Sequence, residues 1–324
     1  MLASPTVPEL RWALTLPFTG VPLADHEPLV RRAEGAGFQD FWTGETNGPD
    51  GFTPLALAAA WTREARLGTG VVNPYTRGIA VLAQHAAALA DASGGRFCLG
   101  LGSSSNVIVE RWNGVPFTKP LTRVREAVEA LRPILEGGRG PGGFKLETAP
   151  SHPVPIYIAA LRDKMLRLGG EQADGTFVNF VPLSALPHMT EQIRAGEEAA
   201  GKPAGSSDVL CRFFCIPQPA EEGMGIARFL LSAYATVPVY EAFFRSHGWG
   251  EALDPMVDAW RDGDRKSALE KAPEDLIREI VIFGSPEEQR ARLEEFTAGG
   301  ITTPVLSFLG SPDQLPGWID ALAP

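Results

Sequence analysis

Short apolar segments alternate with helix-like segments along nearly the whole chain. The apolar segments carry few polar residues, which is typical of parallel strands buried on both faces. They predict strands at residues 12–16, 39–43, 67–71, 97–101, 156–160, 176–179, 209–216 and 304–308. Segments with helical spacing of apolar residues predict helices at 27–35, 54–62, 79–92, 124–135, 163–169, 186–200, 286–298 and 312–322. These eight strand–helix units favour the α/β class and a closed (β/α)8 TIM barrel over an open sheet.

Two stretches interrupt this pattern. Residues 102–120 are too many for an ordinary strand–helix loop, and residues 218–272 form a mostly helical insertion. Helices are predicted in that insertion at 227–235, 239–247 and 253–260. We expect one barrel domain over residues 1–324, with both inserts at the C-terminal ends of the strands. Inserts at these ends usually cover a site or make subunit contacts.

The composition narrows the class of protein. The chain has 324 residues and a net charge of −10, which argues against partners that need a basic face, namely nucleic acid and anionic membranes. No apolar stretch is long enough to span a bilayer. The three cysteines, Cys98, Cys211 and Cys215, are too few for a disulfide framework, so we expect buried free thiols and a cytoplasmic location. The five histidines show no metal-ligand spacing, and we expect no metal.

The most informative feature is a pair of glycine-marked strand ends. The first, residues 66–77, reads RLGTGVVNPYTR, and the second, residues 95–106, reads GRFCLGLGSSSN. Glycine at the end of a strand lets a flat or anionic group approach the backbone closely. Two such ends on adjacent parallel strands predict one side of a cofactor pocket, because barrel enzymes place their chemistry at the C-terminal ends of the strands.

The residues at the predicted strand ends lack most catalytic groups. They include no histidine and no pair of carboxylates, and what remains is backbone, hydroxyls and amides. Such a set suits a site where a bound cofactor does the chemistry and the protein orients it. Glu45 is either a proton-transfer group or a solvated rim residue. Arg77 is more readily explained as the partner of an ion pair, and the serines at 103–105 as ligand contacts or as a flexible loop.

Taken together, several runs resemble one family. LGTGVVNPYTRG, AVLAQHAAALADASGGRFCLGLGSSSN, RWNGVPF, PIYIAAL and the C-terminal FGSPEEQRARLEEFTAGGITTPVL are similar to the bacterial luciferase-like monooxygenase superfamily. More narrowly, they resemble its coenzyme F420-dependent oxidoreductase branch. The resemblance covers residues 11–322 and is more specific for the superfamily than for one cofactor.

The resemblance implies a flavin-like ring across the strand ends. Many members have a non-prolyl cis peptide where the third strand ends, a position that matches Gly70-Val71 here. The implied cofactor-binding residues are Thr46, Gly70, Val71, Asn73, Gly102, Ser103, Ser104, Ala159, Ala160, Leu161, Arg162 and Asn179. Ala159 to Arg162 match a segment that takes a phosphate or lies beside it. Glu45 and Ser105 are the candidate catalytic residues. The histidine that some relatives place after the second strand is absent, and Ser105 stands where a sugar-phosphate dehydrogenase of the branch has a glutamate.

The leading hypothesis is therefore a coenzyme F420-dependent oxidoreductase that exchanges a hydride with a small organic substrate. Three alternatives stay open: an FMN-dependent two-component monooxygenase, a non-catalytic flavin-binding protein, and a redox-free lyase or isomerase of a phosphorylated substrate. Relatives often dimerise, so a homodimer is one candidate assembly, and the sequence leaves the oligomeric state open.

Overall fold

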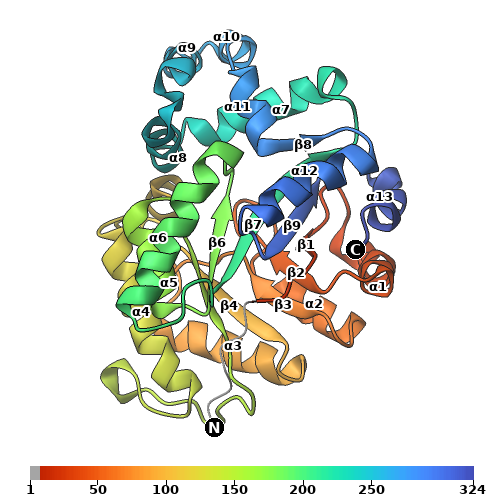
Figure 1. Ribbon diagram of the computed structural model, residues 1–324. Helices are drawn as coiled ribbons and strands as arrows, with labels where there is room; N and C mark the ends of the chain where they lie inside the picture. The colour runs from red at the N-terminus through yellow and green to blue at the C-terminus, as the bar shows by residue number, and fades with distance from the viewer. Residues whose placement is uncertain (1–7) are drawn as a thin grey trace.

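A computed structural model describes residues 8–324 of the chain. Within that range all strand pairings are parallel, and eight strands close a ring in the order β1-β2-β3-β4-β5-β6-β7-β9 (Figure 1). The strands are β1 (Ala13–Leu16), β2 (Asp40–Thr43), β3 (Arg66–Thr69), β4 (Phe97–Leu101), β5 (Ile156–Ala159), β6 (Gly175–Asn179), β7 (Asp208–Ile216), β8 (Val281–Phe283) and β9 (Thr303–Phe308). The predicted TIM barrel is thus confirmed.

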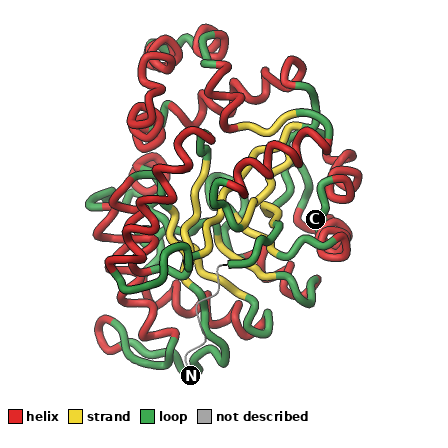
Figure 2. The backbone as a smooth tube through the Cα atoms, viewed as in Figure 1, coloured by secondary structure: helices red, strands yellow, loops and turns green. Residues whose placement is uncertain are grey.

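Helices surround this ring of strands (Figure 2). The α-helices are α1 (Glu27–Ala36), α2 (Thr53–Trp61), α3 (Ile79–Ala92), α4 (Pro120–Leu135), α5 (Asp163–Gln172), α6 (Leu186–Ala199), α7 (Ala220–Ala235), α8 (Pro238–Phe244), α9 (Gly250–Arg261), α10 (Arg265–Glu270), α11 (Glu274–Ile280), α12 (Pro286–Ala298) and α13 (Leu315–Ala321). Shorter helical turns are η1 (Leu23–Asp25), η2 (Val107–Trp112), η3 (Pro141–Gly143), η4 (Leu183–Ala185), η5 (Arg245–Trp249) and η6 (Pro312–Gln314). None of the described helices is both long enough and apolar enough to cross a membrane.

The ends of the helices follow local sequence signals. Ser285 begins α12 with a capping box, in which its hydroxyl accepts from the backbone of Glu288 and the Glu288 carboxylate accepts from the backbone of Ser285. Gly37 ends α1 in the left-handed conformation, with φ of 107°, which glycine adopts without steric cost. These signals fix where the chain turns back toward each new strand.

The helical insertion is longer than the sequence predicted. It runs from α7 through α11, so it extends to Ile280 and not only to residue 272, and Figure 1 shows these helices gathered at one end of the barrel. The short strand β8 that follows was also missed. It pairs with Phe214–Ile216 of β7, beyond the stretch Asp208–Arg212 that pairs with β6. The insertion therefore returns to the barrel along the far end of β7.

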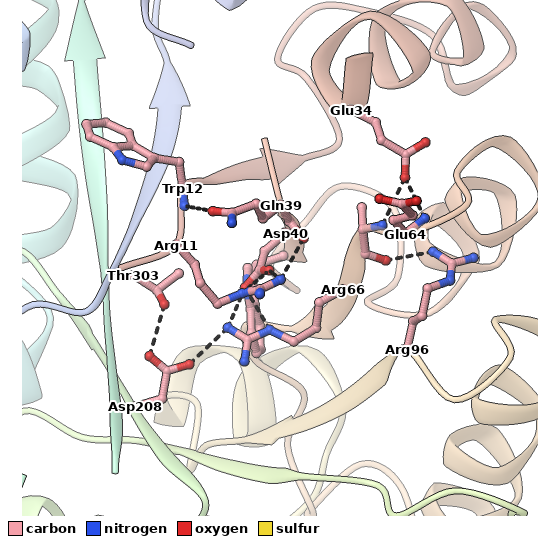
Figure 3. A network of polar contacts seen from close by, with 12 residues as sticks. Arg11, Trp12, Glu34, Gln39, Asp40, Glu64, Arg66, Arg96, Asp208 and Thr303 are labelled. Carbon is pink, nitrogen blue, oxygen red and sulfur yellow. Dashed lines mark hydrogen bonds and ion pairs between the residues drawn. The ribbon is translucent and has the colours of Figure 1, made fainter. Parts of the chain in front are cut away.

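The barrel interior is apolar in its middle and charged at the N-terminal ends of the strands. The middle layer contains Ala13, Trp42, Cys98, Tyr157, Phe177, Leu210 and Val305. Below it, the fully buried Asp40 pairs with Arg11 and Arg66, and Arg66 also pairs with Asp208 (Figure 3). Burial alone would lower the pKa of Arg66, but the charge of Asp40 holds this pKa well above its ordinary value. This balanced network closes one end of the barrel and leaves the other for a site.

The three cysteines are buried and free, as expected from the sequence. Burial raises the pKa of the Cys98 thiol to about 12 and also raises the pKa values of Cys211 and Cys215. Thiols in such surroundings stay protonated and inert, so their contribution is to packing.

Candidate functional site

The third strand ends in the backbone bulge that the resemblance implies. The Gly70–Val71 peptide bond is cis, which confirms that expectation. The Gly70 N–H donates to the carbonyl of Thr43 at 2.5 Å, and Val72 forms an isolated parallel bridge with Leu101. The bulge is thus joined to β2 on one side and to β4 on the other, at the C-terminal ends of the strands.

The glycines around this bulge are required by the protein's own packing. A Cβ on Gly70 would lie 2.7 Å from the ring of Phe177, and one on Gly100 would lie 1.8 Å from the carbonyl oxygen of Thr69. A Cβ on Gly102 would meet Val71 at 2.5 Å and Ala159 at 3.0 Å. The expectation that these glycines leave room for a ligand therefore needs correction, because their open sides face protein atoms. They let β3, β4 and β5 come together, and that close approach shapes the rim.

At the end of β2, Glu45 is held in place by two partners. Both carboxylate oxygens accept from the guanidinium of Arg77, at 2.5 and 2.6 Å, and one also accepts from the Gly51 N–H. Arg77 in turn lies over the ring of Phe52, 5.3 Å from its centroid. The interpretation of Arg77 as an ion-pair partner is confirmed. Thr46 is exposed, and its hydroxyl contacts only the side chain of Asn47 at 3.4 Å among the described polar groups.

The loop after the bulge is organised by Asn73, which is 4% exposed. Its side-chain oxygen accepts from the N–H groups of Tyr75 and Thr76 and from the Thr76 hydroxyl. The Tyr75 hydroxyl then donates to the carbonyl of Thr118 at 2.6 Å. Asn73 therefore shapes this loop, and the loop fastens the end of the 102–120 insert to the barrel.

The serine segment after β4 leads into a π-helical turn, η2. Ser104 has a φ of 61°, which is uncommon for a residue with a side chain. The Ser105 hydroxyl accepts from the Ile108 N–H at 3.3 Å, and the Ser103 hydroxyl donates to the carbonyl of Ser104 at 3.4 Å. π-Helical turns occur often at functional sites. No acceptor for the Ser105 hydroxyl lies within residues 8–324, so this hydroxyl can donate to a ligand or substrate.

The end of β5 meets the bulge through Ala159, while the residues beyond it diverge. Ala160 is buried and its N–H donates to the carbonyl of Phe177; Leu161 is partly buried, and Arg162 is exposed. Arg162 occupies the N-cap of α5, and Asp163 in the first turn pairs with His188 at 3.0 Å. The Asp163 carboxylate already supplies negative charge at the N-terminal end of α5. The exposed Arg162 is therefore a better candidate for binding a phosphate than the helix end itself.

The end of β6 is joined to the helical insertion. The Asn179 amide donates to the Tyr240 hydroxyl of α8 at 3.1 Å. Tyr240 and Tyr234 pack with Phe180 and Phe214, with ring centroids 4.5–6.3 Å apart. Burial and the neighbouring Tyr234 raise the pKa of Tyr240 to about 12. The insertion therefore places a protonated hydroxyl and an aromatic wall beside β6 and β7.

Three polar groups at this end of the barrel were missing from the sequence prediction. They are Thr15 of β1, Arg212 of β7 and Tyr240 of α8. The buried atoms Thr15 Oγ1, Asn179 Oδ1 and Arg212 Nε have no hydrogen-bond partner within residues 8–324. A hydroxyl, an amide acceptor and a cationic donor suit a heterocycle with alternating carbonyl and N–H groups along one edge. These residues fit a flavin-like ring. The surface grooves found beside α12 and α13 contain none of the predicted site residues.

Fold and site together define a barrel protein whose candidate site is built from backbone, hydroxyls and amides at the strand ends. The chain belongs to the luciferase-like monooxygenase family of enzymes, because the model of that family matches residues 12–303.

Three known proteins illustrate the relationship. The chain is 30% identical to a 5,10-methylenetetrahydromethanopterin reductase of Archaeoglobus fulgidus, over 89% of this chain and 90% of the relative. It is 30% identical to a putative coenzyme F420-dependent oxidoreductase of Mycobacterium tuberculosis, over 94% and 97%. The solved coenzyme F420-dependent tetrahydromethanopterin reductase of Methanopyrus kandleri superposes with a TM-score of 0.80 at 24% identity, covering 97% of each chain. At 24% identity, this structural likeness supports the fold alone.

Proposed function

We propose that the chain is a coenzyme F420-dependent oxidoreductase that transfers a hydride between the deazaflavin and a small organic substrate. The observation that carries the proposal is the 30% identity, over 94% of this chain, to a relative described as putatively F420-dependent. The buried polar atoms without a partner in residues 8–324, Thr15 Oγ1, Asn179 Oδ1 and Arg212 Nε, support the binding of a flavin-like ring.

The chain's own residues would bind and orient the ring. Backbone at Gly70–Val71, Gly102–Ser104 and Ala159 would hold it, with Thr46, Asn73, Asn179 and the segment Ala160–Arg162 around it. When bound, the deazaflavin supplies or takes up a hydride, and thus both electrons. The substrate must gain or lose one further proton. Ser105 is suited to carry it because its hydroxyl hydrogen is available, whereas Glu45 is engaged by Arg77 and orders the end of β2.

The test is a titration of the purified apoprotein with F420 and, separately, with FMN, followed by cofactor fluorescence. We expect micromolar or tighter binding of F420 and much weaker binding of FMN. Binding of FMN alone would overturn the proposal and favour a two-component monooxygenase, which oxygen consumption with a flavin reductase would then reveal. Failure to bind either cofactor would favour a redox-free enzyme instead. Reduction of F420 by a panel of alcohols and reduced pterins separates an oxidoreductase from a protein that only binds the cofactor.

A further inference from the structure

Arg212 reaches into the barrel from β7. Asp208 and Leu210 on the same strand face the interior, and residues two apart in a strand point to the same face, so Arg212 faces inward too. In the closed ring, β7 and β3 are four strands apart in either direction. The two strands therefore form opposite walls.

The side chain of Arg212 spans the space between these walls. Its terminal nitrogen donates to the carbonyl of Gly70, the first residue of the cis peptide, at 2.5 Å. The guanidinium lies 5.7 Å from the centroid of the Phe177 ring, and a Cβ on Gly44 would come within 3.0 Å of it. Arg212 is thus held between β2, β3 and β6, directly behind the bulge.

The charge of Arg212 has no counter-charge in the described part of the chain. No carboxylate between residues 8 and 324 lies within 4 Å of its guanidinium, and its buried Nε has no partner. By contrast, Arg66 pairs with both Asp40 and Asp208. A half-buried cation without a carboxylate is costly to keep unless a ligand uses it.

We propose that Arg212 is a positioning residue of the ligand site. It holds the Gly70–Val71 bulge from the opposite wall, and its charge favours a ligand whose ring presents carbonyl oxygens or a delocalised negative charge at that place. The inference deepens the proposed function and rests on it. Charge-assisted hydrogen bonds of a guanidinium are stronger and more directional than those of neutral donors, so both effects depend on the charge.

The experiment compares Arg212→Gln and Arg212→Lys with native protein and with Arg96→Gln. Arg96 is the matched control because, among residues 8–324, its guanidinium bonds to backbone carbonyls and the Thr62 hydroxyl alone, and it lies at the opposite end of β4. Two probes are titrated: F420, and the same 8-hydroxy-5-deazaflavin ring without its phosphate-bearing tail. Fluorescence gives the dissociation constants. Visible absorption of the bound ring gives the fraction with an ionised ring hydroxyl, a signature that a loss of stability alone would not change.

We expect Arg212→Gln to bind both probes about 10- to 100-fold more weakly, with the bound ring shifted toward its neutral form. Arg212→Lys keeps the charge, so it should retain the ionised fraction and lose less affinity, and it serves the test even where the glutamine variant fails to fold. Arg96→Gln should bind as the native protein does. Native-like binding of both probes by a folded Arg212→Gln, or weakening for the tailed probe alone, would overturn the inference. Absence of binding by native protein would instead overturn the proposed function.

Discussion

Replacing Asp40 with asparagine tests whether the charged end of the barrel serves stability alone. Asp40 is 0% exposed and accepts from Arg11 at 2.8 and 2.5 Å, from Arg66 at 2.8 and 2.5 Å and from the Trp42 indole at 3.3 Å. Asparagine has the same shape but no charge. Arg11 would therefore lose the one carboxylate it pairs with in residues 8–324, and Arg66 would keep only Asp208. Removing one partner of a buried ion pair costs about 3–5 kcal/mol, a large part of the roughly 5–15 kcal/mol by which proteins are stable.

The assay for Asp40→Asn is urea-induced unfolding followed by circular dichroism and tryptophan fluorescence, and F420 binding is measured below the unfolding transition. We expect a large drop in the midpoint with unchanged affinity, because the network lies at the end of the strands opposite the site. Asp320→Asn is the control: its pair with Arg32 has both side chains about half exposed, and we expect no measurable change. A native-like midpoint for Asp40→Asn, or lost affinity in the folded variant, would refute the reasoning.

Three further predictions concern the site and its supports. Burial lowers the pKa of His26 below its ordinary value of 6.5, so the folded state disfavours the protonated form of this side chain. The contribution of His26 to the melting temperature should therefore be constant above pH 6.5 and decline as the pH falls below it. A His26→Gln variant should lose this part of the decline. Ser105→Ala should lower turnover at least about tenfold with little loss of stability, whereas Glu45→Gln should mainly lower the free energy of unfolding, by about 1–3 kcal/mol. Steady-state kinetics and unfolding measurements check both variants. Lost turnover in Glu45→Gln together with lost stability in Ser105→Ala would exchange the roles of the two residues. Gly102→Ala should weaken F420 binding by crowding the bulge, while Gly225→Ala, whose Cβ has open space, should bind normally; equal affinities would show that the bulge can shift freely.

The barrel could be predicted because its strands are local signals. The prediction for 97–101 coincides with β4, and the other seven barrel strands are placed within two residues of their observed ends. Each is a buried apolar run bounded by a polar or glycine-containing turn, so the apolar pattern and the turn residues indicate the same strand ends. β8 has only three residues, directly after α11, and a run that short shows no period. The sequence prediction therefore left residues 273–285 without an element, and β8 lies among them.

The sequence correctly placed Gly70 and Gly102 at one rim of the barrel, but the reason it gave for the glycines, room for a ligand, was wrong. Gly70 and Gly102 do lie at one rim, next to each other through Val71. Sequence alone cannot tell whether the missing Cβ makes room for a ligand or for a neighbouring strand, because both select glycine. The structure separates the two explanations by the atoms that a Cβ would meet, and here those atoms belong to the protein. The cis peptide rests on the resemblance, since no propensity of Gly-Val indicates one.

Arg212 could not be found among the residues that follow strands, because it lies inside β7. A different signal was available: Asp208 and Arg212 are charged residues at the same parity of an otherwise apolar strand, so both share one face of it. At a rise of about 3.3 Å per residue they are roughly 13 Å apart, one near each end of the barrel. Arg66 neutralises Asp208, whereas Arg212 has no carboxylate partner in residues 8–324. If Arg212 serves a ligand as proposed, this asymmetry assigns the ligand to the end of the barrel that holds the unpaired charge.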